Sequence, residues 1–477
     1  MDILELVVAW INDKMSLILT VLIFAVGIFL TIRFRFRQTT LLGRGIKHTF
    51  VAEEGAKGDV SSFAAFCTAL SATIGTGNIV GVATALCAGG PGALFWMLIA
   101  AILGMATKYA ECLLAVKYRR QNEDGTFTGG PFTYIEDGMG KKWKWLAVFF
   151  AVCGIACCLL GIGSFSQINS MSSALNTIIP SSTVFVIGTT QITWTIIIGG
   201  ALLGIFIAFV ILGGLKSISK VSTIVVPFMA ILYVLLCLLV LGSNITLIPE
   251  AFRQIVVGAF NPQAVTGGVV GSIIVAMQKG VARGIFSNEA GLGSAPIAAA
   301  AAKTNSPARQ GLIGMTGVFF DTIIICMLTG LTIVITGAWN TGAEGFDVTV
   351  LAFTKAIPFL PGELISTILS VCLLFFAFTT ILGWSYYSDR CVSYLTGDKK
   401  GWSLVFKIIH IVFIFVGPYL TISLVWNVAD VVNSFMAIPN VIALIALSGV
   451  VVKETKDYLN ANKKKPLSGE ENFNKGE

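Results

Sequence analysis

The sequence predicts an all-α polytopic membrane protein with eleven transmembrane helices. Of its 477 residues, 55% are hydrophobic and only 12% are charged, and the mean hydropathy is +0.85. Soluble domains average about 25% charged residues, so the composition indicates a membrane protein. The apolar residues also gather in long uncharged runs, and a helix needs about 20 such residues to cross a bilayer.

Eleven apolar runs follow one another along the chain. We place them at residues 15–33, 60–86, 91–116, 145–179, 191–213, 221–243, 264–286, 311–337, 362–388, 403–422 and 425–452. The first run follows Asp13 and Lys14 and ends without a small-residue cleavage pattern, so we expect a retained helix and not a signal peptide.

The charges of the loops give the orientation. Lys and Arg crowd alternate loops, such as residues 33–57, and the tail after Val452, whereas only Lys14, Arg253 and Lys355 fall on the other side. Cytoplasmic loops are enriched in Lys and Arg. We therefore expect the amino terminus outside and the carboxyl terminus in the cytoplasm. The net charge of +7 is explained by these loops, and we expect no nucleic-acid partner.

The second run contains an interruption at its centre. Residues 60–86 carry no charge, yet Gly75, Gly77 and Gly81 stand at mid-membrane among Thr76 and Asn78. Glycine is a poor helix former, and opened backbone in hydrocarbon is tolerated only where it lines a cavity. Freed carbonyls and amides in such a break can hold an ion and a small zwitterion.

Two other interpretations of this glycine pattern remain open. The spacing of Gly77 and Gly81 could simply allow two helices to pack closely. A nucleotide-binding loop is disfavoured, because no strand precedes the glycines and no P-loop lysine follows them.

The seventh run repeats the theme of the second. Thr266–Ser272 again sets three glycines and two hydroxyls in an apolar segment. The two runs lie five spans apart, so they cross the membrane in opposite senses, and paired broken helices of this kind indicate a transporter. We expect a five-plus-five inverted repeat, divided as 1–59 (extra helix and basic loop), 60–245 (first repeat), 262–453 (second repeat) and 454–477 (tail).

Charged groups within the runs are few. Glu111 follows Lys108 by three residues and could pair with it on one helical face. Asp321 and Asp430 are functional candidates by position. Since neither lies beside a predicted break, a satisfied packing contact is the simpler interpretation. Cys153, Cys157 and Cys158 resemble small buried residues and not a disulfide set or a metal site. No catalytic triad, paired acids or metal-ligand cluster is visible, so we expect no enzyme.

Neutral oxygens are more plentiful. Thr379 and Thr380 are adjacent in the ninth run and precede Trp384. Na⁺ prefers oxygen ligands such as hydroxyls and carbonyls, so the two hydroxyls could face the break of the second run and bind Na⁺ there. Alternatively, they could donate hydrogen bonds back to carbonyls of their own helix. Gln167 is a lone amide that could bind another helix or a substrate.

Several runs of sequence resemble the alanine/glycine:cation symporter family, also called the sodium:alanine symporters. They are Ala72–Ala83, Gly129–Tyr134, Gly163–Ser170 and Gly280–Pro296, and the similarity extends over essentially the whole chain. The resemblance implies a prokaryotic cell-membrane protein with the leucine-transporter fold that moves small amino acids with Na⁺.

The resemblance also implies the roles of individual residues. The expected substrate-binding residues are Gly75, Thr76, Gly77, Asn78, Gln167, Gly268, Val269, Gly271, Ile273 and Trp384. The expected Na⁺ ligands are the carbonyls of Ser71 and Ile74 and the hydroxyls of Thr379 and Thr380. The family often has Phe where Val269 stands, which bears on pocket size. Asn288 and Glu289 are interpreted as gate or packing residues.

The expected function is Na⁺-coupled uptake of a small neutral amino acid, alanine or glycine, by alternating access in a monomer within the lipid bilayer. Glutamine, serine or threonine as the main substrate, and proton coupling through Asp321 or Asp430, are the nearer alternatives. An amino-acid sensor on a transporter scaffold is the remoter one, since the tail is too short to fold as a signalling domain.

Overall fold

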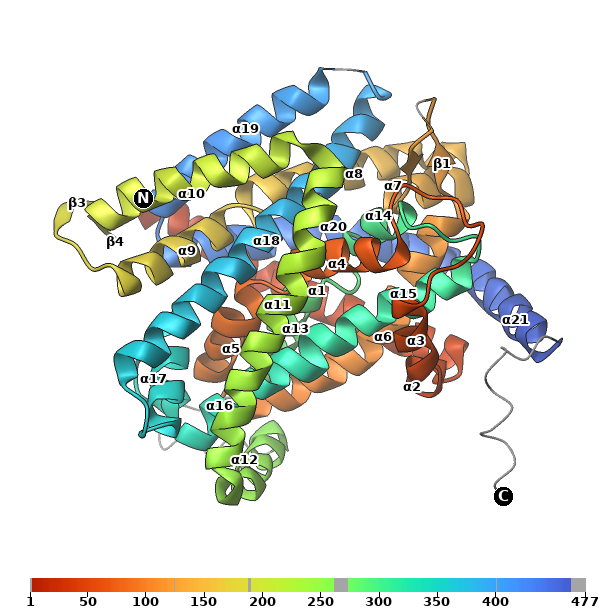
Figure 1. Cartoon of the computed structure of the whole chain (residues 1–477). Helices are drawn as coiled ribbons and strands as arrows, with labels where there is room; N and C mark the ends of the chain where they lie inside the picture. The colour runs from red at the N-terminus through yellow and green to blue at the C-terminus, as the bar shows by residue number, and fades with distance from the viewer. Residues whose placement is uncertain (1, 124, 188–189, 261–272, 400, 465–477) are drawn as a thin grey trace.

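The computed structural model describes residues 2–123, 125–187, 190–260, 273–399 and 401–464. These residues form a bundle of helices that cross at many angles (Figure 1). The described strands form two short antiparallel hairpins, β1 (Arg120–Gln121) with β2 (Phe127–Thr128) and β3 (Thr183–Ile187) with β4 (Thr190–Thr193). The predicted all-α class is confirmed.

The first half of the chain forms an extra helix and then the elements around the first break. Its helices are α1 (Asp2–Phe34), α2 (Arg37–Thr40), α3 (Leu42–Phe50), α4 (Ser62–Thr73), η1 (Gly77–Gly81), α5 (Val82–Gly89), α6 (Gly92–Lys117), α7 (Pro131–Thr133), η2 (Tyr134–Gly138), η3 (Lys141–Trp143), α8 (Lys144–Leu160), α9 (Phe165–Ile178), α10 (Trp194–Leu212) and α11 (Gly214–Ser243).

The second half contains a comparable series. Its helices are η4 (Ile245–Leu247), α12 (Ile248–Phe260), α13 (Ile273–Asn288), α14 (Ala295–Ala300), α15 (Pro307–Val318), η6 (Phe319–Cys326), α16 (Met327–Thr336), η7 (Ala338–Asn340), α17 (Phe346–Ala356), α18 (Gly362–Thr396), α19 (Trp402–Val416), η8 (Gly417–Tyr419), α20 (Ile422–Ala446) and α21 (Ser448–Lys464).

Nearly all the predicted spans have a counterpart. Within the described residues, nine helices are long and apolar enough to cross a membrane, and the bent pair Ser62–Thr73 with Gly77–Gly89 makes ten. The seventh run, predicted at 264–286, is not among them. In the described part of that region α13 runs from Ile273 to Asn288, and α14 follows after a short non-helical stretch. The fourth run is two helices, α8 and α9, where we expected one.

The broken pair lies at the centre of the bundle. α4 packs against α11 and α18, η1 and α5 pack against α13, and α6 packs along α13 and α15. Gly383 of α18 allows a close approach, because a Cβ there would lie 2.6 Å from the Cβ of Ala72 on α4. The outer helices carry exposed apolar side chains, among them Leu202, Phe209 and Ile224, as expected of a lipid-facing surface.

Candidate substrate and ion site

The helical hydrogen bonding of the second span is interrupted at Ile74, and the two halves are bent by 50°. The amide of Gly75 donates to Oδ1 of Asn78 at 2.8 Å, where a continuing helix would direct it to the carbonyl of Ser71. The amide of Asn78 donates to the carbonyl of Gly75 at 3.2 Å, where a helix would use Ile74. The carbonyls of Ser71 and Ile74 therefore lose their helical partners. These are the two carbonyls that the sequence analysis expected to bind Na⁺.

The threonine pair of α18 faces this break through one of its two hydroxyls. Oγ1 of Thr380 lies 3.3 Å from the carbonyl oxygen of Ile74 and 2.9 Å from that of Phe376. Oγ1 of Thr379 donates to Phe375 at 3.0 Å and Phe376 at 3.1 Å, within its own helix. The structure thus brings Thr380 directly to the opened backbone. Both hydroxyls also make the back-bond to their own helix that the sequence had left as an alternative, Thr379 to Phe375 and Thr380 to Phe376.

Gln167 of α9 meets the same break from the other side. Its Oε1 accepts from the amide of Thr76 at 3.3 Å, while its Nε2 donates to the carbonyl of Ile162 at 3.0 Å. The Oγ1 of Thr76 is buried and has no hydrogen-bond partner among the described residues. Buried hydroxyls are normally satisfied, so this oxygen is available to a ligand. A Cβ on Gly75 would collide with the hydroxyl of Thr380, which explains the glycine.

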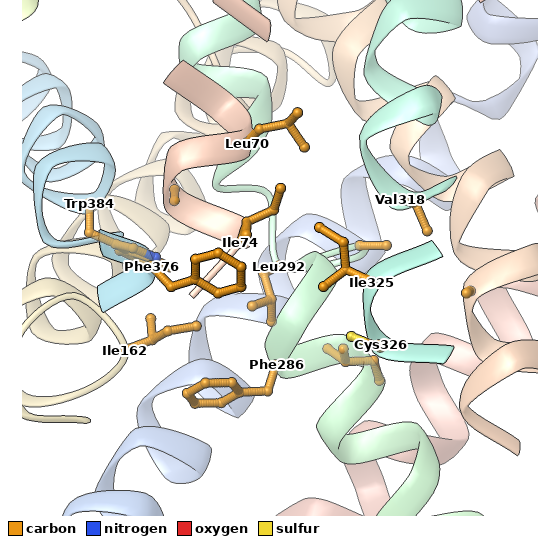
Figure 2. Close-up of a cluster of buried hydrophobic side chains, with 14 of the residues drawn as sticks. Leu70, Ile74, Ile162, Phe286, Leu292, Val318, Ile325, Cys326, Phe376 and Trp384 are labelled. Atoms are coloured by element: carbon orange, nitrogen blue, oxygen red, sulfur yellow. The ribbon is translucent and has the colours of Figure 1, made fainter. Parts of the chain in front are cut away.

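Apolar side chains enclose these polar groups. Figure 2 shows Ile74 beside Phe376, with Ile162, Leu292 and Phe286 below and Trp384 to the left. Trp384 is fully buried, and its indole Nε1 donates to Oε1 of Glu289 at 2.7 Å. The enclosure suits a small solute, because charged and polar contacts strengthen where water is excluded.

A second break lies at residues 289–294, between α13 and α14. Glu289 has a left-handed backbone with φ of 55°, which is uncommon for a residue other than glycine. Its Oε2 accepts from Oγ of Ser294 at 2.5 Å, across the break. The amides of Gly291 and Gly293 both donate to Oε1 of Glu111, at 3.0 and 3.2 Å. The buried carboxylate of Glu111 therefore holds the opened backbone from α6.

Asp321 lies beside the first break, contrary to the interpretation of the sequence. Its Oδ1 accepts from Nδ2 of Asn78 at 2.8 Å, and its Oδ2 accepts from Ser287 at 2.8 Å and Thr322 at 2.7 Å. Ser287 is near the end of α13, so one carboxylate joins both broken spans. The π-helical η6 carries Asp321, and such irregular turns are frequent at functional sites.

Other expectations have mixed outcomes. Lys108 and Glu111 form no ion pair in the part of the chain that the structure describes, because Nζ of Lys108 has no hydrogen-bond partner there and Glu111 binds the second break. Asp430 instead pairs with Arg283 at 2.7 Å. No group of three or more His, Cys, Asp or Glu residues among the described residues could hold a metal ion.

Of the four residues expected on the seventh span, only Ile273 lies within the described residues. Gly268, Val269 and Gly271 lie outside the described residues. Ile273 begins α13 with 40% of its side chain exposed. The residues of α13 that contact Gly77 are Phe286 and Ser287, about 20 Å further along the helix at 1.5 Å per residue.

Sequence reasoning missed the participation of Ser287, Glu289 and Asp321. A signal for the second break was present in Asn288–Pro296, which contains two glycines and a proline next to an acidic residue. Because that stretch follows the end of the seventh run predicted at 264–286, its glycines do not indicate a break within a span.

A bundle with a bent, glycine-rich central span and a buried polar break defines a secondary transporter with the leucine-transporter fold. The structure is similar to the crystal structure of MhsT in complex with L-phenylalanine, with a TM-score of 0.55 and 14% sequence identity over 84% of this chain and 100% of that chain.

Within that class, the chain belongs to the sodium:alanine symporter family, whose sequence profile matches residues 1–473. It is 46% identical over 446 residues to the sodium/alanine symporter AgcS of Methanococcus maripaludis, with 92% of this chain and 93% of the relative covered. It is also 38% identical to the "Probable sodium/glutamine symporter GlnT" of Bacillus subtilis, with 97% and 92% covered. The family and the fold are those of transporters, not enzymes.

Proposed function

We propose that this protein couples the inward movement of Na⁺ to the uptake of a small neutral amino acid, alanine or glycine. The observation that carries the proposal is the first break. It frees the carbonyls of Ser71 and Ile74 beside the hydroxyl of Thr380, and it leaves the buried hydroxyl of Thr76 without a hydrogen-bond partner among the described residues. Carbonyl and hydroxyl oxygens are ligands that suit a hard cation, and they need no carboxylate.

In this proposal the two solutes share one opened segment. Na⁺ binds the carbonyls of Ser71 and Ile74 with the hydroxyl of Thr380, and it orders the segment 74–78. The substrate carboxylate binds at the amides of this segment, as amides at the start of a helix receive an anion, and there it takes the place of the side-chain oxygens of Asn78 and Gln167 that now accept from Gly75 and Thr76. Until then, Gln167 supports the segment through Thr76. Because Na⁺ orders the backbone that binds the substrate, binding of either solute raises the affinity of the protein for the other.

The energetic requirement is modest. A single charge that enters across a potential of 100 mV releases about 2.3 kcal/mol, and the Na⁺ concentration gradient adds to this.

The name of the AgcS relative supports alanine as the substrate, and the name of the GlnT relative supports glutamine as the alternative.

Uptake of labelled alanine into proteoliposomes, with Na⁺ and pH gradients imposed separately, tests the proposal. We expect accumulation with the inward Na⁺ gradient alone and none with the pH gradient alone. The opposite pattern would reject Na⁺ coupling in favour of protons. Competition by glycine, serine, threonine and glutamine then identifies the preferred substrate.

The basic tail supports a carboxyl terminus in the cytoplasm and an amino terminus outside. Labelling of a cysteine introduced at each terminus, in intact cells, tests that orientation.

A further inference from the structure

The two half-helices that adjoin the breaks are joined at one end of the bundle. Just before α4 begins, Val60 forms a parallel β-bridge with Ala302, just after α14 ends. The amide of Val60 donates to the carbonyl of Ala301 at 3.2 Å, and the amide of Lys303 donates to the carbonyl of Val60 at 2.8 Å. The start of α4 and the end of α14 therefore cannot separate while this bridge is intact.

Arg119 spans the same junction from beyond the end of α6. Its Nη1 donates to the carbonyls of Ala300 at 2.9 Å and Ala302 at 2.8 Å. Its Nη2 donates to the carbonyls of Lys57 at 3.0 Å and Thr304 at 2.7 Å. One planar guanidinium thus binds four carbonyls on both sides of the junction. Ala300 is the last residue of α14, where helix carbonyls lack helical partners, and Ala302 and Thr304 belong to the segment that follows.

The surroundings hold Arg119 in this position. The ring of Phe127, on β2, lies 4.3 Å from its guanidinium carbon, and the amide of Phe127 donates to the carboxylate of Asp59 at 3.0 Å. Gly58 allows the two segments to approach, because its φ is 156° and a Cβ there would lie 2.5 Å from the carbonyl carbon of Ala302. β1, α7 and α14 are grouped at this end of the molecule (Figure 1).

We propose that Arg119 keeps the entrance between α4 and α14 closed, and we call this residue the latch. The charges of the loops assign this entrance to the cytoplasmic side. With its four bonds made, α4 and α14 stay together and the central site is closed at this end. Release of the solutes requires α4 and α14 to part, and Arg119 must then give up carbonyls on one side of the junction. This latch acts on the alternating-access step of a secondary transporter, so it does not depend on which amino acid or ion is carried.

Native cysteines provide the test. Cys112 is 2% exposed and faces a small cavity of about 20 Å³ between α4, α6, α14 and α15, so it becomes reachable when α4 and α14 part. Cys87, on α5, is exposed, and Cys237 is fully buried in α11. Purified full-length protein is treated with N-ethylmaleimide, and the labelling rate of each cysteine is followed by peptide mass spectrometry.

We expect Arg119→Met to raise the labelling rate of Cys112 at least about tenfold, with Cys87 and Cys237 unchanged. Gly58→Ala, which leaves Arg119 in place but obstructs the bridge, should have the same effect. Arg120→Met is the matched control, since Arg120 pairs with Asp137 at 2.7 Å and not with the junction. An unchanged Cys112 rate in both Arg119→Met and Gly58→Ala would overturn the latch. So would an equal rise at Cys237, which reports general unfolding.

Discussion

Replacing Asp321 with alanine removes the acceptor of three buried hydrogen bonds where the two broken spans meet. Asn78, Ser287 and Thr322 lose partners that lie at 2.8, 2.8 and 2.7 Å. A buried donor left unsatisfied costs about 1–3 kcal/mol, so the variant should lose about 3 kcal/mol or more of stability. The amide of Asn78 then keeps only the backbone carbonyl of residue 321, at 3.1 Å, as an oxygen acceptor, and Oδ1 of the same amide accepts from Gly75 in the opened segment.

Asp321→Asn separates geometry from charge. The asparagine keeps one oxygen for Asn78 and offers an amide group to the hydroxyl of Ser287, which can accept as well as donate. Thermal unfolding in detergent and the alanine concentration for half-maximal Na⁺-driven uptake are the two measurements. We expect Asp321→Ala to be destabilised and to need about tenfold or more alanine, and Asp321→Asn to stay near the parent. An asparagine variant as defective as the alanine variant would refute the positioning role and favour proton coupling.

Three further changes have defined outcomes. Thr380→Val should raise the Na⁺ concentration for half-maximal uptake about 10-fold or more, since the proposed site loses one ligand oxygen. Thr379→Val should have a smaller effect, because the hydroxyl of Thr379 does not contact the break and bonds its own helix. Equal Na⁺ dependence of uptake in the parent and both variants would reject this ion site. Val269→Phe should preserve the uptake of alanine and glycine, and larger amino acids should compete less well with labelled alanine. A hydrophobic wall discriminates between substrates by about 1–3 kcal/mol per methylene. Identical competition profiles in the parent and the variant would reject a role of Val269 in substrate specificity. Burial, with Arg309 nearby, lowers the pKa of His48 to about 4. The unfolded chain therefore takes up this proton at a higher pH than the folded chain, so stability should fall as the pH drops from 6.5 towards 4; a His48→Gln variant with the same fall in melting temperature would contradict this.

Most of the spans could be predicted from the sequence because hydrocarbon imposes a simple rule on them. A helix that crosses a membrane needs about 20 apolar residues, and this length is visible in composition alone. The first break was equally visible, since Gly75, Gly77 and Gly81 stand in an uncharged run. The structure opens the backbone there, between Thr73 and Gly77.

The second break was harder to place because two glycine-rich stretches compete in that region. Thr266–Ser272 lies outside the described residues, whereas residues 289–294 open beside Trp384 and Glu111. The contact that holds residues 289–294 open is a tertiary one. Glu111 comes from a helix 180 residues earlier and accepts the amide of Gly291, and no local pattern reveals such a partner.

Asp321 shows the same limit. Its distance in sequence from Asn78 is 243 residues, so the bond between them follows from how η6 packs against η1 and not from any motif. The absence of a nearby predicted break made it resemble a packing residue. Its three donors lie on η1, α13 and η6.

Equilibrium binding of labelled alanine to the purified protein, at a series of Na⁺ concentrations with K⁺ replacing Na⁺, tests the central claim most directly. If the opened segment at Ile74–Asn78 holds both solutes, alanine affinity should rise steeply with Na⁺, fall below detection in K⁺ alone, and lose its Na⁺ dependence in the physiological range in Thr380→Val. Alanine that binds equally well in Na⁺ and in K⁺ would contradict the shared site.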